Sequence, residues 1–307
     1  MKKKLYCRAG VLSVFLIMVA LSALSYAAPQ DDGVIRTGGS TTLLPVIATA
    51  ASDFMDKYKT WDKAAAGLPP KEIKIYVMGG GSGFGVQSTV QGTSNIGLVS
   101  RELKEAEKKS LGPHNVVVVG KDAVAFAVNK GNPLVGKVKN LSRAQVADIF
   151  SGKISTYKEI DPSLPGDKIV LLVRDPGAGS SEMVQGMVMG KEQISKNALQ
   201  LPSQGALLKK LETNRLSLAY ISAGLLHGSD NLYGFAFEGE DPSEANIISG
   251  RYSLVRPLYM VVKEPQDPLI KRFIDYVLTE GQKAVKDNHY IPINNDAVKQ
   301  RVKGRQG

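Results

Sequence analysis

The chain has 307 residues, of which 43% are hydrophobic and 22% are charged, so it can bury a large core and lacks the composition of a disordered protein. Its length suits two domains. The formal net charge of +10 suits an anionic ligand, but the basic residues are scattered without interleaved aromatic residues, which argues against a nucleic-acid partner.

The first 27 residues have the pattern of a secretory signal peptide. An apolar run over 9–24 is preceded by Lys2, Lys3, Lys4 and Arg8 and followed by the small-residue pattern Ser25-Tyr26-Ala27. We therefore expect cleavage after Ala27, a periplasmic location and a net charge near +6 for the mature chain. The alternative is a retained membrane anchor, for which a run of about 16 residues is short.

The only cysteine, Cys7, lies before the apolar run, where a lipid-accepting cysteine does not occur. The mature chain is thus expected to contain no disulfide and no thiol nucleophile.

Strands and helices are expected to alternate along the first half of the mature chain. Strands are predicted at 34–36, 73–77, 95–99, 116–119 and 123–128, the last two separated by the turn Gly120-Lys121-Asp122. Helices are predicted at 46–58, 86–91 and 104–110, with a loop at 61–70.

The second half continues the alternation. Ser142 is expected to cap a helix that stops at Ser151-Gly152. Strands are predicted at 169–173, 217–221 and 252–262, the last interrupted at Pro257, and helices at 181–189, 204–211 and 269–278, the last of these being the final substantial one. This order predicts an α/β architecture with mainly parallel sheets flanked by helices.

Three small-residue turns each follow a predicted strand and open a predicted helix. They lie at 39–45, 79–85 and 174–181. A helix start leaves N–H groups unpaired and carries partial positive charge, while glycine permits close approach and Ser or Thr adds hydroxyl donors. Since ligands bind at the carboxyl ends of strands in such sheets, the three turns could surround one small oxyanion.

The glycine turns and two arginines also have structural interpretations. Glycine turns before helices are also common punctuation in folds without a site. Arg101 could be a surface ion-pair partner of Glu102 or Glu105. Arg256, before Pro257, is expected to be structural in a hinge strand.

Enzymatic chemistry is not expected. The three histidines, His114, His227 and His289, lie in no metal-ligand spacing, so we expect no metal and no cofactor. Ser180 is not in a G-x-S-x-G nucleophile elbow, and no glycine turn ends in G-K-[ST], so no catalytic residue is assigned. A secreted phosphatase is the enzymatic alternative.

Nine segments in order carry a resemblance to a known family: G-S-T-T-L-L-P at 39–45, G-G-G-S-G-F-G at 79–85, N-I-G-L-V-S-R-E-L at 95–103, D-A-V-A-F-A-V-N at 122–129, D-I-F-S-G-K-I at 148–154, V-R-D-P-G-A-G-S at 173–180, L-A-Y-I-S at 218–222, R-P-L-Y-M-V-V at 256–262 and E-G-Q at 280–282. With these, the chain resembles the phosphate-binding proteins of bacterial phosphate ABC importers, which have the type II periplasmic binding-protein fold.

The resemblance implies two lobes joined by two crossing strands that close on a dehydrated oxyanion. Residues 28–122 and 255–307 would form lobe 1, and residues 123–254 would form lobe 2, with crossings near 120–125 and 250–258. A monomer that delivers its ligand to the membrane permease of an ABC importer is implied. Phosphate is the expected ligand, with sulfate, molybdate and arsenate as alternatives, and an exported sensor or scaffold as the alternative function.

The resemblance also implies a ligand-binding set. Arg174 would make a bidentate contact to the oxyanion, and the remaining residues would donate from hydroxyl or backbone groups. Two departures are Ala178, where the family usually has serine, and Pro176, where it commonly has an acid, which leaves Asp175 as the candidate partner of Arg174. The matching positions are Ser40, Thr41, Thr42, Ser82, Ser100, Arg101, Arg174, Gly179, Ser180 and Ser181.

Overall fold

The computed structural model describes residues 33–293, so the predicted signal peptide and its cleavage position lie outside the described residues. The central feature is a mixed sheet whose strand order is β2 (Lys74–Gly79), β1 (Val34–Gly39), β3 (Ile96–Val99), β11 (Val255–Lys263), β4 (His114–Asn129), β8 (Ser217–Ser222), β6 (Val170–Arg174) and β7 (Leu199–Leu201). Two short strands, β9 (Leu232–Gly234) and β12 (Ile291–Pro292), also pair with β4, and β5 (Asn140–Leu141) pairs with β10 (Ala236–Phe237).

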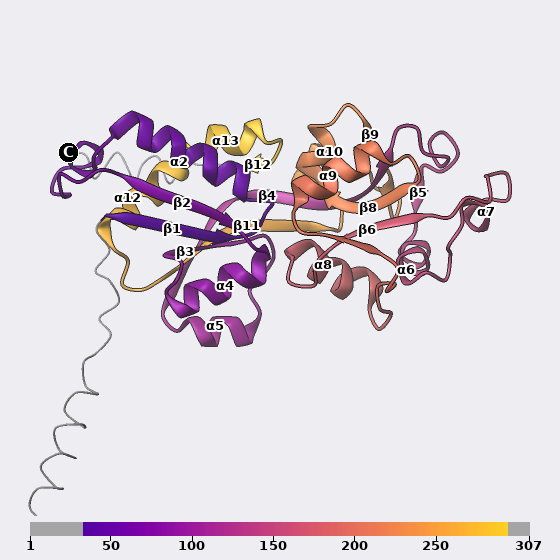
Figure 1. Cartoon of the computed structure of the whole chain (residues 1–307), viewed down its shortest axis with the longest axis horizontal. Coiled ribbons are helices and arrows are strands. Elements are labelled where there is room, and N and C mark those ends of the chain that lie inside the picture. The colour runs from indigo at the N-terminus through magenta and orange to yellow at the C-terminus, as the bar shows by residue number, and fades with distance from the viewer. Residues whose placement is uncertain (1–32, 294–307) are drawn as a thin grey trace, which may run out of the picture. The chain divides into compact units, whose positions relative to one another are not determined.

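Helices cover both faces of the β1–β3 part of the sheet (Figure 1). On one side lie α2 (Leu44–Tyr58), α12 (Pro268–Val277) and α13 (Gln282–Asp287), and on the other α4 (Gly81–Gln91) and α5 (Glu105–Leu111). The part containing β6 and β8 is flanked by α6 (Arg143–Ser151), α8 (Gly179–Val184), the π-helix η1 (Gln185–Met189), α9 (Gln204–Thr213) and α10 (Ala223–His227). The remaining short helices are α3 (Trp61–Ala64), α7 (Tyr157–Ile160) and α11 (Glu244–Ser249).

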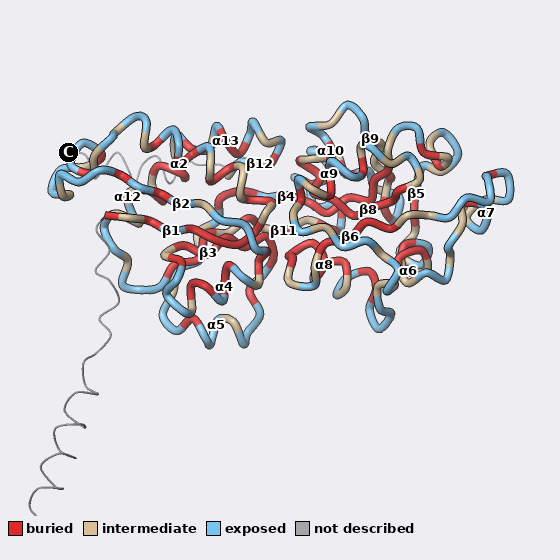
Figure 2. The backbone as a smooth tube through the Cα atoms, viewed as in Figure 1, coloured by how far each residue is buried: buried red, intermediate tan, exposed pale blue. Residues whose placement is uncertain are grey.

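Two large hydrophobic cores lie along this sheet, and the buried backbone in each follows the strands (Figure 2). The first core contains residues of 35–98, Val119 and residues of 258–290, with Phe54 packed against Trp61 and Phe273. The second core contains residues of 123–254. Strands β4 and β11 contribute to both cores, so the chain passes between them twice.

The pairing directions differ between the middle and the ends of the sheet. Strand β1 pairs parallel with β2 and β3, and β6 pairs parallel with β7 and β8. In the middle, β11 runs antiparallel to β3 and β4, and β4 runs antiparallel to β8. The α/β class expected from the sequence is therefore confirmed, with a mixed sheet. The parallel ends bring the last residues of β1, β2, β3 and β6 towards one region.

Several predicted element boundaries are wrong. The two strands expected at 116–119 and 123–128 are one strand, β4, because Gly120 and Lys121 continue the pairing opposite Leu258 and Pro257. Pro257 therefore does not interrupt β11, whose irregularity falls between Leu258 and Tyr259. Helix α3 lies in the expected loop, α4 begins at Gly81, and α13 follows α12.

Local capping interactions explain why the start and end of α6 match the prediction. Ser142 accepts a hydrogen bond from the Gln145 amide at 3.2 Å and starts α6, as expected. Gly152 follows the helix with φ of 85°, the left-handed conformation that glycine adopts without strain.

Candidate functional site

The three small-residue turns meet around one small cavity. Eight of the ten residues predicted from the sequence line it, and Gly81, Ala178 and Gln204 complete the lining. The eight are Ser40, Thr41, Thr42, Ser82, Ser100, Arg174, Gly179 and Ser180.

The first turn connects β1 to α2. The Ser40 amide donates to the Leu98 carbonyl at 2.7 Å, which holds the turn against β3. The Ser40 hydroxyl accepts from the Thr42 and Leu43 amides at 3.2 and 3.4 Å. Its oxygen is thereby occupied as an acceptor, and its hydrogen is left to donate.

The second turn is held close to the sheet by glycines. A Cβ added to Gly85 would lie 2.4 Å from the Leu98 carbonyl oxygen, and one added to Gly97 would lie 2.5 Å from the Gly85 oxygen. This close approach of α4 to β3 brings Ser82 beside Ser100, whose amide donates to the Ser82 hydroxyl at 3.0 Å. The two hydroxyl oxygens are 3.3 Å apart.

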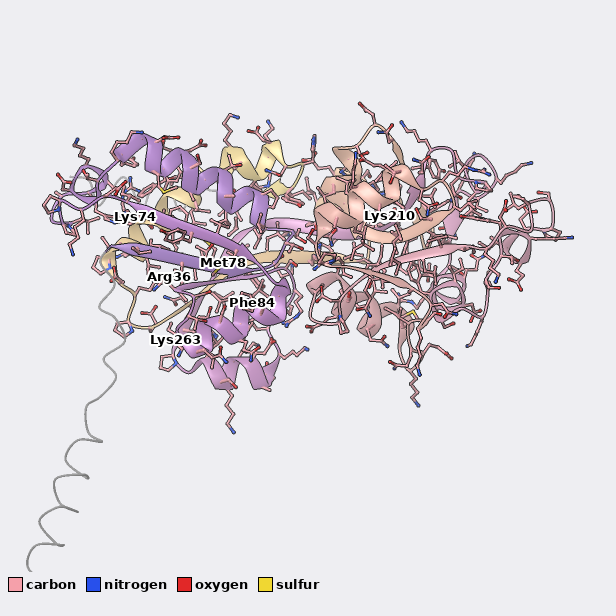
Figure 3. The ribbon with its side chains drawn as sticks, in the orientation of Figure 1. Arg36, Lys74, Met78, Phe84, Lys210 and Lys263 are labelled. Carbon is pink, nitrogen blue, oxygen red and sulfur yellow. The ribbon has the colours of Figure 1, made fainter. Side chains whose placement is uncertain are left out.

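The outer side of the same turn is exposed and apolar. Met78 near the end of β2 and Phe84 in α4 are both exposed, and both are labelled in Figure 3. A Cβ added to Gly80 would lie 2.5 Å from the Phe84 ring. Glycine at this position, with φ of 154°, therefore makes room for the ring over the turn.

Arg174, the last residue of β6, is almost fully buried at one end of the cavity. Its Nε donates to the Leu201 carbonyl at 2.8 Å and its Nη2 to the Pro202 carbonyl at 3.0 Å. Nη2 also pairs with Asp175 at 2.8 Å, so this carboxylate orients Arg174 in place of the acid absent at 176. Nη1 donates to the Thr41 hydroxyl at 2.6 Å, and the second hydrogen of Nη1 is available for a ligand.

The turn that opens α8 lies against the second turn. The Gly83 amide donates to the Gly177 carbonyl at 3.1 Å. A Cβ added to Gly179 would lie 2.6 Å from Ser82 Oγ and 2.8 Å from Ser100 Oγ. Glycine at 179 thus allows the turn that opens α8 to approach Ser82 and Ser100 closely.

Arg101 and Ser181, which were also predicted as ligand contacts, lie outside the cavity lining. The Arg101 guanidinium is held by Glu107 at 2.7 Å and by Glu182 at 3.0 Å. Burial alone would raise the pKa of Glu107, but hydrogen bonds from Arg101 and the Lys104 backbone outweigh it and lower that pKa. Ser181 Oγ is bonded to the Arg174 carbonyl at 2.9 Å and the Tyr220 hydroxyl at 2.8 Å. The geometry thus favours the ion-pair interpretation of Arg101, with Glu107 and Glu182 as partners in place of the expected Glu102 or Glu105.

Gln204 lines the cavity and was missed by the sequence reasoning. It opens α9, and its Nε2 donates to the Ser180 hydroxyl at 3.2 Å while its backbone amide donates to Thr41 Oγ1 at 3.2 Å. A signal was present: Ser203 stands where an N-cap is expected before the helix predicted at 204, so this is a fourth polar helix start.

The cavity presents hydrogen-bond donors. Each of its six hydroxyl oxygens, in Ser40, Thr41, Thr42, Ser82, Ser100 and Ser180, accepts a hydrogen bond from a protein N–H group. A hydroxyl that accepts from an N–H group directs its own hydrogen away from that group. Among residues 33–293, no carboxylate lines the cavity. Together with Arg174 and the helix starts, this arrangement suits a small oxyanion.

Two features of other classes of protein are not found in the described part of the chain. Among residues 33–293, no group of three or more His, Cys, Asp or Glu side chains could hold a metal ion. Within the same range, none of the helices combines the length and apolar character needed to cross a membrane.

Several known proteins similar to this chain are phosphate-binding proteins. Residues 25–280 match the family model of the PBP superfamily domain. The phosphate-binding protein PstS of Staphylococcus epidermidis is 27% identical over 274 residues, covering 84% of this chain and 78% of that protein. A Clostridium perfringens structure, described as a phosphate ABC transporter substrate-binding protein with bound phosphate, has a TM-score of 0.72 and 28% identity, covering 85% of this chain and 100% of that one. An ABC-type phosphate transport receptor from Vibrio cholerae, 23% identical with a TM-score of 0.65 and coverage of 84% and 100%, shares the fold.

Proposed function

Because the chain belongs to the PBP superfamily, we propose that it is an extracytoplasmic solute-binding protein that captures phosphate for delivery to an ABC importer. The observation that carries the proposal is the cavity lining, which contains six hydroxyl groups and Arg174. Among the described residues, no Asp or Glu side chain lines the cavity. The phosphate-binding activity of the similar Staphylococcus and Clostridium proteins supports it.

Binding is proposed to occur between two lobes. Residues 28–122 and 255–307 would form lobe 1 around the first core, and residues 123–254 would form lobe 2 around the second. Thr41 and Gly83, which would belong to lobe 1, contact Arg174 and Gly177, which would belong to lobe 2, and these contacts support a closed conformation. Lobe closure would exclude water and strengthen the charge-assisted hydrogen bonds to the anion.

The ligand would leave the site chemically unchanged. The six hydroxyls are set as donors by neighbouring N–H groups, which suits recognition of acceptor oxygens. The proposed role is therefore transport and not catalysis. Export through the signal peptide predicted at 1–27 would place the protein where an importer collects its substrate.

Calorimetric titration of residues 28–307, freed of bound ions, with phosphate and then with sulfate at neutral pH tests the proposal. Tight binding of phosphate with a much weaker response to sulfate is the expected result. Preferential binding of sulfate or molybdate would retain the transport class and change the substrate. Absence of any oxyanion binding would overturn the proposal in favour of a sensor or scaffold.

A further inference from the structure

A buried ion pair joins the two strands that run between the cores. Asp122 of β4 and Arg256 of β11 are directly opposite each other in the antiparallel register. Asp122 Oδ2 lies 2.8 Å from Arg256 Nη2 and 3.1 Å from Arg256 Nε, and both side chains are only 1% exposed. Burying two charges costs free energy that their attraction repays only with further hydrogen bonds, so the other partners of the pair matter.

The other partners of Arg256 are two cavity hydroxyls and the Ser100 carbonyl, which accepts from Nη1 at 3.5 Å. Arg256 Nη2 donates to Thr42 Oγ1 at 3.1 Å, and Nη1 donates to Ser100 Oγ at 3.4 Å. A hydroxyl has one hydrogen, and an oxygen that accepts from a guanidinium directs that hydrogen away from it. Thr42 lies in the turn at 39–45 and Ser100 directly follows β3, and both line the cavity, so one arginine contacts two of its hydroxyl groups.

Asp122 connects the same pair to the second core. Its Oδ1 accepts a hydrogen bond from the Gly224 amide at 3.3 Å, in the first turn of α10. The guanidinium is therefore held in place by a carboxylate that is itself held by an element of the second core.

We propose that Arg256 is a positioning residue for oxyanion recognition: held by Asp122, it turns the Thr42 and Ser100 hydroxyls into donors towards the bound anion. This inference rests on the function proposed above and extends it to a residue outside the cavity lining. The sequence-based expectation was that Arg256 is structural in a hinge strand, and the inference adds a role in recognition. In the structural interpretation, Arg256 stabilises the strand crossing, and its loss lowers stability without acting through Thr42.

A double-mutant cycle between Arg256 and Thr42 separates the two interpretations. Arg256→Lys keeps the positive charge but lacks the planar fork that reaches both hydroxyls. Thr42→Val removes the hydroxyl and nearly keeps the shape. We expect each single variant to weaken phosphate binding by about tenfold. We expect the double variant to lose little more phosphate affinity than the single variant that binds phosphate less tightly, because both changes remove the same donor.

Additive losses in the double variant would overturn the inference, as would unchanged phosphate affinity in Arg256→Lys. Arg272→Lys is the matched control: Arg272 binds the Ala64 carbonyl and the Tyr58 hydroxyl in the first core, and its replacement is expected to leave affinity unchanged.

Two further outcomes are separable. If Arg256→Lys does not fold, the cycle is repeated with Asp122→Asn, which keeps the arginine and removes the negative charge that holds its guanidinium. Unfolding of both variants assigns the pair to stability and overturns the inference. A wild-type protein that binds no oxyanion in the same titration instead overturns the proposed function, and with it this inference.

Discussion

Arg174 Nη1 and Thr41 Oγ1 are 2.6 Å apart although the two residues are separated by 133 positions in the chain. Arg174 ends a strand of the second core, and Thr41 lies in the turn that leaves the first strand of the first core. The contact therefore exists only when the two cores are close together. Arg174 carries a positive charge and bonds to the opposite side of the cavity, so it is placed to couple the approach of the two cores to anion binding.

Replacing Arg174 by alanine is expected to abolish oxyanion binding, with phosphate affinity falling about 100-fold or more, because a buried charged donor is lost and Asp175 is left without its partner. Calorimetric titration measures the loss, and circular dichroism checks folding. The control is Arg143→Ala in α6, whose guanidinium lies over the Phe237 ring away from the cavity. Wild-type affinity in the Arg174 variant would remove this residue from the site.

Replacing Gly179 by alanine is expected to weaken phosphate binding at least tenfold while the ligand-free protein keeps its melting temperature. The new methyl group would lie 2.6 Å from Ser82 Oγ, an approach that occurs only between the two turns. Gly186→Ala is the matched control, because a Cβ there has no neighbour within 4 Å. Equal affinities in the two variants would show that the turns do not need this close approach.

Glu182 of α8 joins the second core to two cations of the first. It lies 3.0 Å from Arg101 Nε and 2.5 Å from Lys104 Nζ. Since Lys104 is largely exposed and Arg101 keeps its pair with Glu107, we expect Glu182→Gln to weaken phosphate binding by only about two- to fivefold. The difference from wild type is expected to shrink at high salt, where exposed ion pairs are screened.

The control for this prediction is Glu192→Gln. Glu192 pairs with Lys153 within 123–254, so its loss is expected to leave affinity unchanged at every salt concentration. An effect of Glu182→Gln that grows with salt would contradict the proposed electrostatic link between the lobes.

The lowered pKa of Glu107 predicts an acid-sensitive contribution to stability. A carboxyl group whose pKa is lower in the folded protein stabilises the fold above its ordinary pKa of 4.5 and loses that contribution as the pH falls through the folded value. Below about pH 4.5, wild-type stability is therefore expected to fall more steeply than that of Glu107→Gln, which lacks the titrating group. Denaturant unfolding between pH 7 and pH 3 measures this, and parallel curves would contradict it.

The elements and the three turns could be predicted because their signals are local. The Ser142 cap and the Gly152 stop of α6 involve residues within one helix. The glycine turns likewise follow from strand patterns that end beside small residues. Local signals of this kind determine where a helix starts, whereas the individual site residues were implied by the family resemblance.

The remaining features depend on contacts between distant segments. The Arg101 guanidinium is held by Glu107, six residues away, and by Glu182, 81 residues away, and the matching motif contains neither carboxylate. The contact of Arg256 with Thr42 spans 214 residues, and only the pairing of β11 with β4 brings them together. Side-chain direction at such positions is set by tertiary packing, which a pattern along the chain does not contain.

Replacing Ala178 by serine is expected to strengthen phosphate binding about fivefold, because a hydroxyl group would be added to a buried position in the cavity lining that now offers only a methyl group. Titration of the variant beside wild type measures the gain, and Ala147→Ser in α6, outside the cavity, is the matched control. A stronger effect on sulfate than on phosphate would show that the new group serves as a donor without favouring the protonated anion. Unchanged affinity for both anions would mean that the existing donors already satisfy the ligand oxygens, and that the departure at 178 has no cost for binding.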